Sequence, residues 1–292
     1  MMDLIANLIS GLSLGSIYAL IALGYTMVYG IAKMLNFAHG DIIMVGAFAV
    51  ITTVSMLGFP PALAIAASVV CCVVLGVCVE RIAYKPLRKS PPLAVLITAI
   101  GVSYFLQSLA LLIFGSTQHS FPKVFSVPTL ALGALTIRGD MLVTLAVTTA
   151  IMVGMSLFIA KSRTGKAMRA VSEDRDAAEL MGISVNRTIT ITFAIGSALA
   201  AVAGVFYGTT YGFIGPYTGS MPGIKAFVAA VFGGIGSMPG AMLGGILLGV
   251  IENLAKRYIS TELSDAIVFA VLIIVLMVKP TGLLGKRVTE KV

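Results

Sequence analysis

Long runs without any charged residue are the feature that most constrains this chain. Charge-free stretches extend over residues 4–32, 42–79, 90–122, 141–160, 188–224 and 226–251. An α-helix crosses the hydrocarbon core of a bilayer with about 20 apolar residues, so each run has room for at least one transmembrane helix. The run over 42–79 has room for two, because Gly58-Phe59-Pro60-Pro61 breaks it near the middle. Transmembrane strands are shorter and alternate in hydrophobicity, so we predict an all-α polytopic membrane protein with about eight hydrophobic segments.

Composition agrees with this interpretation. Of the 292 residues, 58% are hydrophobic and 11% are charged, and the mean hydropathy is +1.03. Soluble domains carry about 25% charged residues, so an ordinary soluble enzyme and a nucleic-acid-binding domain are both excluded. We therefore expect the lipid bilayer as a partner and no nucleic acid. The net charge of +8 must then be concentrated in the loops and the tail.

The basic residues fall into three blocks, and these predict the orientation of the chain. Lysine and arginine are enriched in cytoplasmic loops of membrane proteins, so we expect all three blocks, and with them the C-terminus, in the cytoplasm. The N-terminus is then outside. The blocks are Arg81, Lys85, Arg88 and Lys89; Lys161, Arg163, Lys166, Arg169, Arg175 and Arg187; and Lys279, Lys286, Arg287 and Lys291.

The region over 222–256 does not fit a single crossing, because the basic tail would then emerge outside. Two full crossings need about 40 residues, which is more than this region supplies. We predict a broken or re-entrant pair that enters from outside and returns there, leaving Lys256 and Arg257 outside. A single kinked helix is the alternative. The break would lie at Gly233, Gly234, Gly236, Ser237, Pro239 and Gly240.

Residues that could carry catalysis are scarce. The two histidines are His39 and His119, and no cluster has the spacing of a hydrolase triad or of a metal site. The chain has no glycine-rich phosphate loop ending in Gly-Lys-Ser/Thr, so we expect it to bind no ATP itself. Ion-coupled carriers usually hold acidic groups inside the membrane. Only Asp41 and Glu252 come close here, and both lie toward segment ends, so the sequence indicates a pathway without its own energy source.

The loop over 161–187 contains a short predicted helix. Ser172 is the expected N-cap, Glu173 and Asp174 lie in the first turn, and Gly182 suits the left-handed conformation that ends a helix. Between them lies a small apolar face, too small to insert into lipid, which would let the surface of another protein approach closely. A solvated connector is the alternative. The residues of this face are Ala177, Ala178, Leu180 and Met181.

Polar residues near the first span have two interpretations each. Asn36, His39 and Asp41 share a turn with Gly40, where they either cap the next helix or line the inner mouth of a pathway, and capping is preferred. Tyr18 lies on a partly aromatic helix face, where packing is preferred over substrate contact. The Gly240-x-x-x-Gly244 and Gly245-x-x-x-Gly249 spacings suit close helix contacts, within the chain or with a second membrane subunit.

Several motifs resemble one transporter family. Asp176-Ala177-Ala178-x-x-x-Gly182 is similar to the loop by which membrane subunits of ABC importers dock on their ATPase, with Asp in place of Glu. The stretches Gly15–Ile31, Leu35–Asp41, Glu80–Arg88, Lys225–Ala241 and Lys279–Gly285 resemble, in order, the branched-chain amino-acid ABC permeases. The likeness covers nearly the whole chain.

This resemblance implies a single transmembrane permease domain over 1–292, with a coupling loop at about 161–187. It also implies a bacterial inner-membrane assembly of this chain, a second related permease and two ABC ATPases that use ATP and magnesium, with a periplasmic binding protein delivering branched-chain or other neutral amino acids. The alternative is a self-contained channel or secondary carrier for a small polar solute, such as urea or another amino acid. That alternative leaves the predicted helix at 172–182 without a function.

Overall fold

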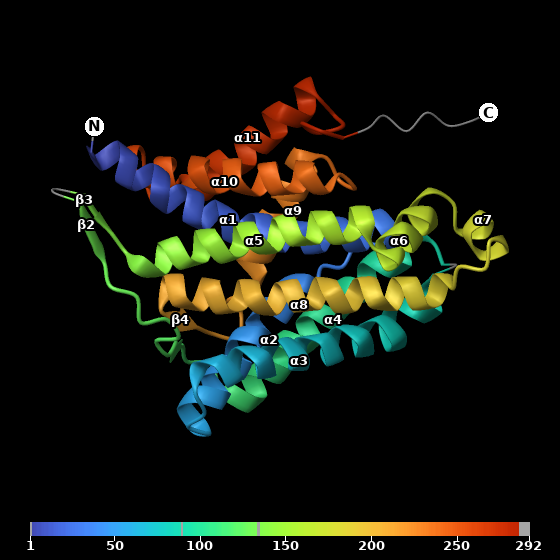
Figure 1. The fold of residues 1–292 in the computed structure, drawn as a ribbon, viewed down its shortest axis with the longest axis horizontal. Helices are drawn as coiled ribbons and strands as arrows, with labels where there is room; N and C mark the ends of the chain where they lie inside the picture. The colour runs from blue at the N-terminus through green and yellow to red at the C-terminus, as the bar shows by residue number, and fades with distance from the viewer. Residues whose placement is uncertain (1, 89, 133–134, 286–292) are drawn as a thin grey trace.

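The computed structural model describes residues 2–88, 90–132 and 135–285, so Lys89, Lys286, Arg287 and Lys291 of the basic blocks lie outside the described residues. Most of the described chain is helical, and the long helices lie side by side (Figure 1). Helical bounds are α1 Met2–Ala32, α2 His39–Ile51, α3 Pro61–Val79, α4 Pro92–Phe114, α5 Gly139–Lys161, α6 Arg163–Glu173, α7 Arg175–Leu180, α8 Val185–Tyr211, α9 Ser220–Gly233, α10 Met238–Tyr258 and α11 Ser264–Val278.

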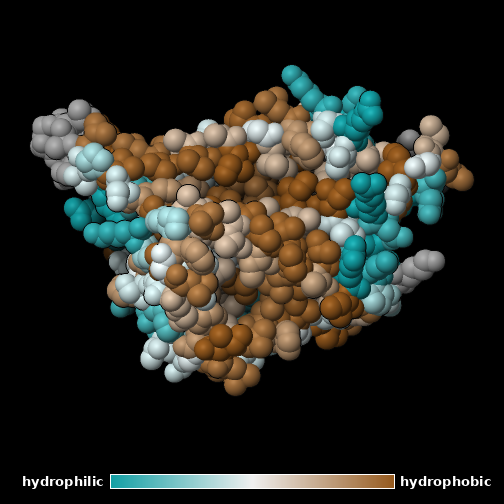
Figure 2. Space-filling view, turned by 60° about the horizontal axis from the view of Figure 1, so that its bottom comes forward, coloured by the Kyte–Doolittle hydropathy of each residue, from teal (hydrophilic) through white to brown (hydrophobic). Residues whose placement is uncertain are grey.

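Seven segments of the described chain are long and apolar enough to cross a membrane, namely α1, α2 with its extension, α3 with its extension, α4, α5, α8 and α10. The apolar helices α9 and α11 are shorter. Proline stops and starts these helices as expected, because α3 begins at Pro61 and α4 at Pro92. The prediction of a polytopic helical membrane protein is confirmed. Figure 2 shows the matching surface, an apolar middle with hydrophilic side chains toward both ends.

Two helices continue into π-helical turns, α2 at Thr52–Met56 and α3 at Glu80–Tyr84. Four short strands also qualify the all-α prediction. Strand β1 (His119–Ser120) pairs antiparallel with β4 (Phe213–Ile214), and β2 (Leu130–Leu132) pairs antiparallel with β3 (Leu135–Ile137). These strands lie at one end of the bundle, which we call the strand end, whereas α7 projects from the opposite end, the α7 end (Figure 1).

Glycine lets α1 and α10 pack against each other without intervening side chains. A Cβ on Gly245 would lie 2.3 Å from the Cα of Ala19, and one on Gly249 would lie 2.2 Å from the Cα of Gly15. Gly244 faces the other way, toward the carbonyl of Ala229 on α9. Both small-residue motifs of α10 are therefore occupied within the chain, and the predicted pairing with a second permease through them is wrong. Close approach is favourable because backbones without side chains between them gain dispersion contacts.

Helices α9 and α10 form an antiparallel hairpin, so the alternative of a single kinked helix is wrong. Gly233, the last residue of α9, contacts Gly240 in the first turn of α10. Between them, Gly234 and Gly236 have φ values of +106° and +91°, which favour glycine. The Ser237 hydroxyl caps α10 by accepting a hydrogen bond from the Gly240 N–H at 3.2 Å, and Pro239 occupies the first turn. The predicted break is therefore present between α9 and α10, with Gly234, Gly236 and Ser237 in the turn and Gly233, Pro239 and Gly240 within the flanking helices.

Contacts between the ends of the segments show how this hairpin runs. Gly30, near the end of α1 at the α7 end, lies beside Gly236, whereas Asn253 donates from its side chain to the Asn7 carbonyl at 2.6 Å near the start of α1. Helix α10 therefore runs from the α7 end to the strand end. The chain then returns through α11, and the Leu283 N–H donates to the Phe232 carbonyl at 2.9 Å, back at the α7 end.

Candidate functional site

The loop expected to dock on a partner contains two helices in place of the predicted one. Helix α6 continues to Glu173, and the Ser172 hydroxyl donates to the Arg169 carbonyl at 2.7 Å within it, so Ser172 is not the cap. Asp174 adopts an extended conformation and caps α7, accepting from the N–H groups of Asp176 at 2.9 Å and Ala177 at 3.0 Å. The N-cap is Asp174 and not Ser172, because the buried Met168 and Val171 pack into the core and keep α6 helical past Ser172.

Helix α7 ends as its sequence indicates. Gly182 has φ +79°, the Gly182 N–H donates to the Glu179 carbonyl at 2.9 Å, and the Ile183 N–H donates to the Ala178 carbonyl at 3.0 Å. Only glycine adopts this left-handed conformation without strain. The chain can thus turn sharply out of α7 and into α8.

The apolar face of α7 is divided between the protein's own core and the exterior. Ala178 is buried in the same hydrophobic cluster as Met168 and Val171, so the expectation that it faces a partner is wrong for the described structure. Ala177 and Asp176 are exposed. Leu180 and Met181 are 89% and 82% exposed, at the tip of the bundle. Two neighbouring apolar side chains left in water are the feature of this loop that indicates an interface.

Polar contacts tie this loop to the transmembrane helices. The Arg175 guanidinium donates to the Ala32 carbonyl at the end of α1, where a cation is favoured by the helix dipole. The Arg88 guanidinium donates to Glu80 at the end of α3 and to Asn186 at the start of α8, and the Thr190 hydroxyl donates to Glu80 at 2.8 Å. Glu80 is fully buried. These bonds join α7 to the end of α1, and the segment that follows α3 to the start of α8.

The three polar residues between α1 and α2 do not share a role. Asn36 accepts a hydrogen bond from the Tyr84 hydroxyl at 2.9 Å. The His39 ring packs edge-on against Tyr25, with 4.7 Å between ring centroids, and fills the space beside Gly24. All of these side chains are buried. Helix α2 has no side-chain cap, so the preferred capping role is wrong, and none of the three lies at an open mouth.

Asp41 belongs to a buried polar cluster between α2, α4 and α9. The Gln107 amide donates to Asp41 at 2.9 Å and to the Ser220 hydroxyl at 3.1 Å, and the Ser103 hydroxyl also donates to Asp41. Gly40 lies directly against Gly219 at the start of α9. The cluster therefore satisfies a buried acidic group at the point where the broken segment meets α2.

A second buried polar cluster joins α9, α10 and α11, and the sequence analysis did not anticipate it. Lys225 Nζ lies 2.8 Å from Glu252 Oε1 and 2.6 Å from Asp265 Oδ1, and Lys256 Nζ lies 2.5 Å from Glu252 Oε1. Glu252 is fully buried. The sequence signal was Lys225 itself, a lone lysine between two charge-free runs.

Tyr18, a predicted pathway residue, lies next to this cluster. Its side chain is buried and neighbours both Glu252 and Tyr211. Tyr211 stacks on Tyr207, with 4.4 Å between ring centroids. The aromatic face of α1 thus packs against charged groups, and the substrate-contact role of Tyr18 stays a prediction.

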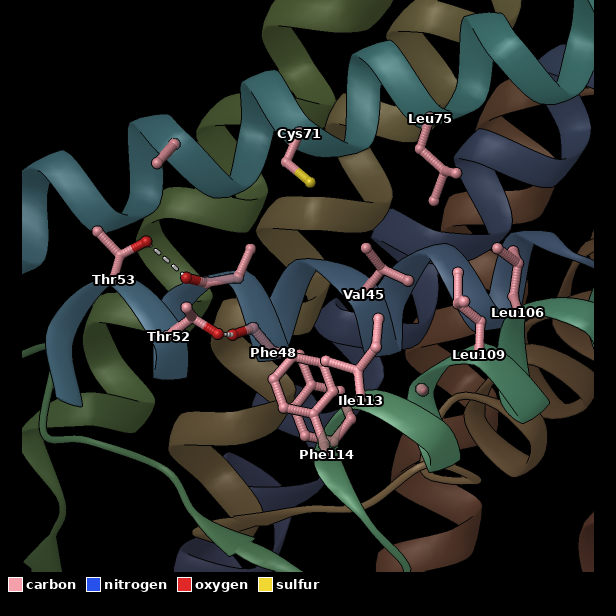
Figure 3. Close-up of a pocket in the computed structure, with 13 residues that line it drawn as sticks. Val45, Phe48, Thr52, Thr53, Cys71, Leu75, Leu106, Leu109, Ile113 and Phe114 are labelled. Carbon is pink, nitrogen blue, oxygen red and sulfur yellow. Dashed lines mark hydrogen bonds between the residues drawn. The ribbon is translucent and has the colours of Figure 1, made fainter. Parts of the chain in front are cut away.

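A cavity of about 400 Å³ opens between α2, α3 and α4 (Figure 3). Its lining is apolar, with Phe48, Leu106 and Phe114 among the contributors. The hydroxyls of Thr52 and Thr53 are already used, since they donate to the Phe48 and Ala49 carbonyls of their own helix at 2.9 and 2.7 Å. The threonine hydroxyls therefore have no hydrogen left to donate to a solute in this cavity, and the lining is otherwise almost entirely apolar.

Comparisons with known proteins agree with this architecture. The family model described as "Branched-chain amino acid transport system / permease component" matches residues 7–276. The high-affinity branched-chain amino acid transport system permease protein BraD of Pseudomonas aeruginosa is 45% identical over 98% of this chain and 97% of its own length. LivH of Escherichia coli K12, which carries the same description, is 47% identical over the same shares.

One relative and one solved structure are less similar to this chain. The probable branched-chain amino acid transport permease protein LivH of Methanocaldococcus jannaschii is 29% identical over 63% of this chain and 60% of its own length. The solved structure "PsaBC from Streptococcus pneumoniae in complex with Fab" aligns with 95% of this chain and 91% of that chain at a TM-score of 0.46 and 16% identity. The family match and the relatives of 45% identity and above decide the matter: the chain belongs to the family of branched-chain amino acid transport system permease components.

Proposed function

We propose that this chain is the membrane-spanning permease subunit of an ATP-driven importer of branched-chain amino acids. The observation that carries the proposal is the near-full-length similarity to permeases of high-affinity branched-chain systems, at 45–47% identity. The chain would form the translocation pathway together with a second, related permease. A periplasmic binding protein would deliver leucine, isoleucine or valine to the strand end.

The exposed pair Leu180 and Met181 supports a docking role for α7. In this proposal two ABC ATPases bind the α7 end, use ATP and magnesium, and move α7 as they close. The bonds from Arg175 to α1 and from Arg88 to α3 and α8 would carry that movement into the transmembrane helices. The chain itself would bind no nucleotide and no metal.

This arrangement also assigns an orientation. The α7 end would face the cytoplasm and hold the C-terminus, and the strand end would face the periplasm of a bacterial inner membrane. The basic block at Lys161–Arg187 supports it, because lysine and arginine accumulate on the cytoplasmic side.

Reconstitution of the complete complex tests the proposal. Proteoliposomes containing this chain, its sister permease and both ATPases, with the binding protein outside and ATP inside, should accumulate radiolabelled leucine. Omitting the ATPases, or replacing ATP with a non-hydrolysable analogue, should abolish accumulation. If the purified chain alone exchanges leucine or urea across the bilayer, it is a channel or secondary carrier and the proposal is wrong.

A further inference from the structure

The charged cluster on α9, α10 and α11 is an unusual feature for an apolar bundle. Four charged side chains meet there, Lys225 and Lys256 with Glu252 and Asp265, and the cluster carries no net formal charge. Glu252 is fully buried, whereas Asp265 is 39% exposed at its side chain. Charged groups placed within membrane-spanning segments usually mark substrate or ion pathways.

Stability alone does not account for this cluster. Removing charges from water costs more than an ion pair of ordinary geometry returns, and apolar side chains of similar volume would hold the same helices at least as well. Only one oxygen of the Glu252 carboxylate is paired, because among the described residues the Oε2 atom has no hydrogen-bond partner. A buried carboxylate with one free oxygen is suited to receive a further donor.

A cavity at the strand end reaches to within one helical turn of this cluster along α9. It has a volume of about 460 Å³ and is lined by residues that include Tyr207, Tyr211 and Met221. Tyr211, in the wall of the cavity, and the buried Tyr18 both lie close to Glu252. Met221 is 43% exposed and precedes Lys225 by one helical turn of α9.

We propose that this cluster recognises the charged backbone groups of a zwitterionic α-amino acid that enters through this cavity, and this inference rests on the proposed function. The substrate ammonium would donate to Glu252 Oε2 after the Tyr18 and Tyr211 side chains move aside. The substrate carboxylate would bind Lys225 in place of Asp265, which is the cheapest partner to displace because water already reaches it. The apolar substrate side chain would lie against the stacked rings of Tyr207 and Tyr211.

The charge balance explains the preference for a zwitterion. A cationic or anionic solute would leave one uncompensated charge in a poorly hydrated place, whereas a zwitterion brings one charge of each sign to a neutral cluster. Backbone recognition also leaves the side-chain choice among neutral amino acids to other parts of the transport system.

Protection of an introduced thiol tests this inference. Cys71, Cys72 and Cys78 are replaced by serine or alanine, Met221→Cys is added, and the complete complex is labelled with a membrane-impermeant thiol reagent in the absence of the binding protein. Leucine at about ten times its Kd should slow labelling roughly tenfold, by mass action. 4-Methylpentanoate, which lacks the ammonium, and 3-methylbutylamine, which lacks the carboxylate, should not slow it.

Matched variants locate the effect. Glu252→Gln should abolish protection by leucine, measured as the ratio of the labelling rates with and without leucine, and Glu179→Gln on the exposed face of α7 should keep the wild-type ratio. If the complex with Glu252→Gln fails to assemble, the comparison of the three ligands on the Met221→Cys complex still tests whether both charged groups of leucine are recognised. Equal labelling rates with and without leucine, or equal protection by all three ligands, would overturn the inference. Accumulation of leucine by the same proteoliposomes reports separately on the proposed function.

Discussion

The exposed tip of α7 allows a quantitative prediction about ATPase docking. Leu180→Ala/Met181→Ala removes the two apolar side chains that are 89% and 82% exposed. Burying a leucine or methionine side chain in an interface contributes about 1.5–3 kcal/mol. We take about 2 kcal/mol for each, because association also orders these side chains. The loss of about 4 kcal/mol corresponds to roughly 1,000-fold weaker binding if both are fully buried, and to roughly 100-fold if burial is partial.

The permease itself should be unaffected by this change. Both side chains lie mostly in solvent, and alanine is the best helix former, so α7 keeps its structure. The melting temperature of the purified variant should therefore match that of the wild type. Ala178 is a less informative position for substitution, because it is buried and a bulky replacement there would disturb the core of the permease.

The assay is the dissociation constant between detergent-solubilised permease and purified ATPase, together with leucine uptake by the reconstituted complex. Glu179→Gln is the control, since Glu179 is exposed on the same helix and should bind as the wild type does. A double variant that binds the ATPases within about threefold of the wild-type affinity would refute the assignment of α7 as the docking helix.

Three further predictions follow from the packing and the topology. Gly245→Val should force α1 and α10 apart, because a Cβ there would lie 2.3 Å from backbone atoms of α1. The yield of monodisperse protein in size-exclusion chromatography should therefore fall. Gly154→Val should leave this yield unchanged, because Gly154 has open space around it. Asp174→Ala should destabilise α7 by about 1 kcal/mol, measured as faster amide hydrogen exchange, while Ser172→Ala leaves exchange unchanged. Arg257→Cys in a cysteine-free background should react with impermeant reagents added from outside, and labelling only from the cytoplasmic side would contradict the proposed orientation.

Local chemistry in the sequence was enough to predict the spans and their boundaries. The charge-free runs and the Gly58-Phe59-Pro60-Pro61 break predicted where the helices lie, because an apolar run of membrane length has few alternatives to a helix. The break at Gly233–Gly240 and the end of α7 at Gly182 were equally readable, since positive φ values favour glycine.

The sequence could not decide which groups meet across the bundle. Ser172 and Asp174 are both competent caps, and the choice between them depended on how far the buried face of α6 extends. In the structure Ala178 faces the core and Leu180 faces solvent, although the sequence of α7 alone does not show which of the two side chains is buried. Lys225 and Glu252 are brought together only when α9 folds back along α10. Burial and pairing depend on contacts between segments far apart in the chain, so the tertiary structure decided them.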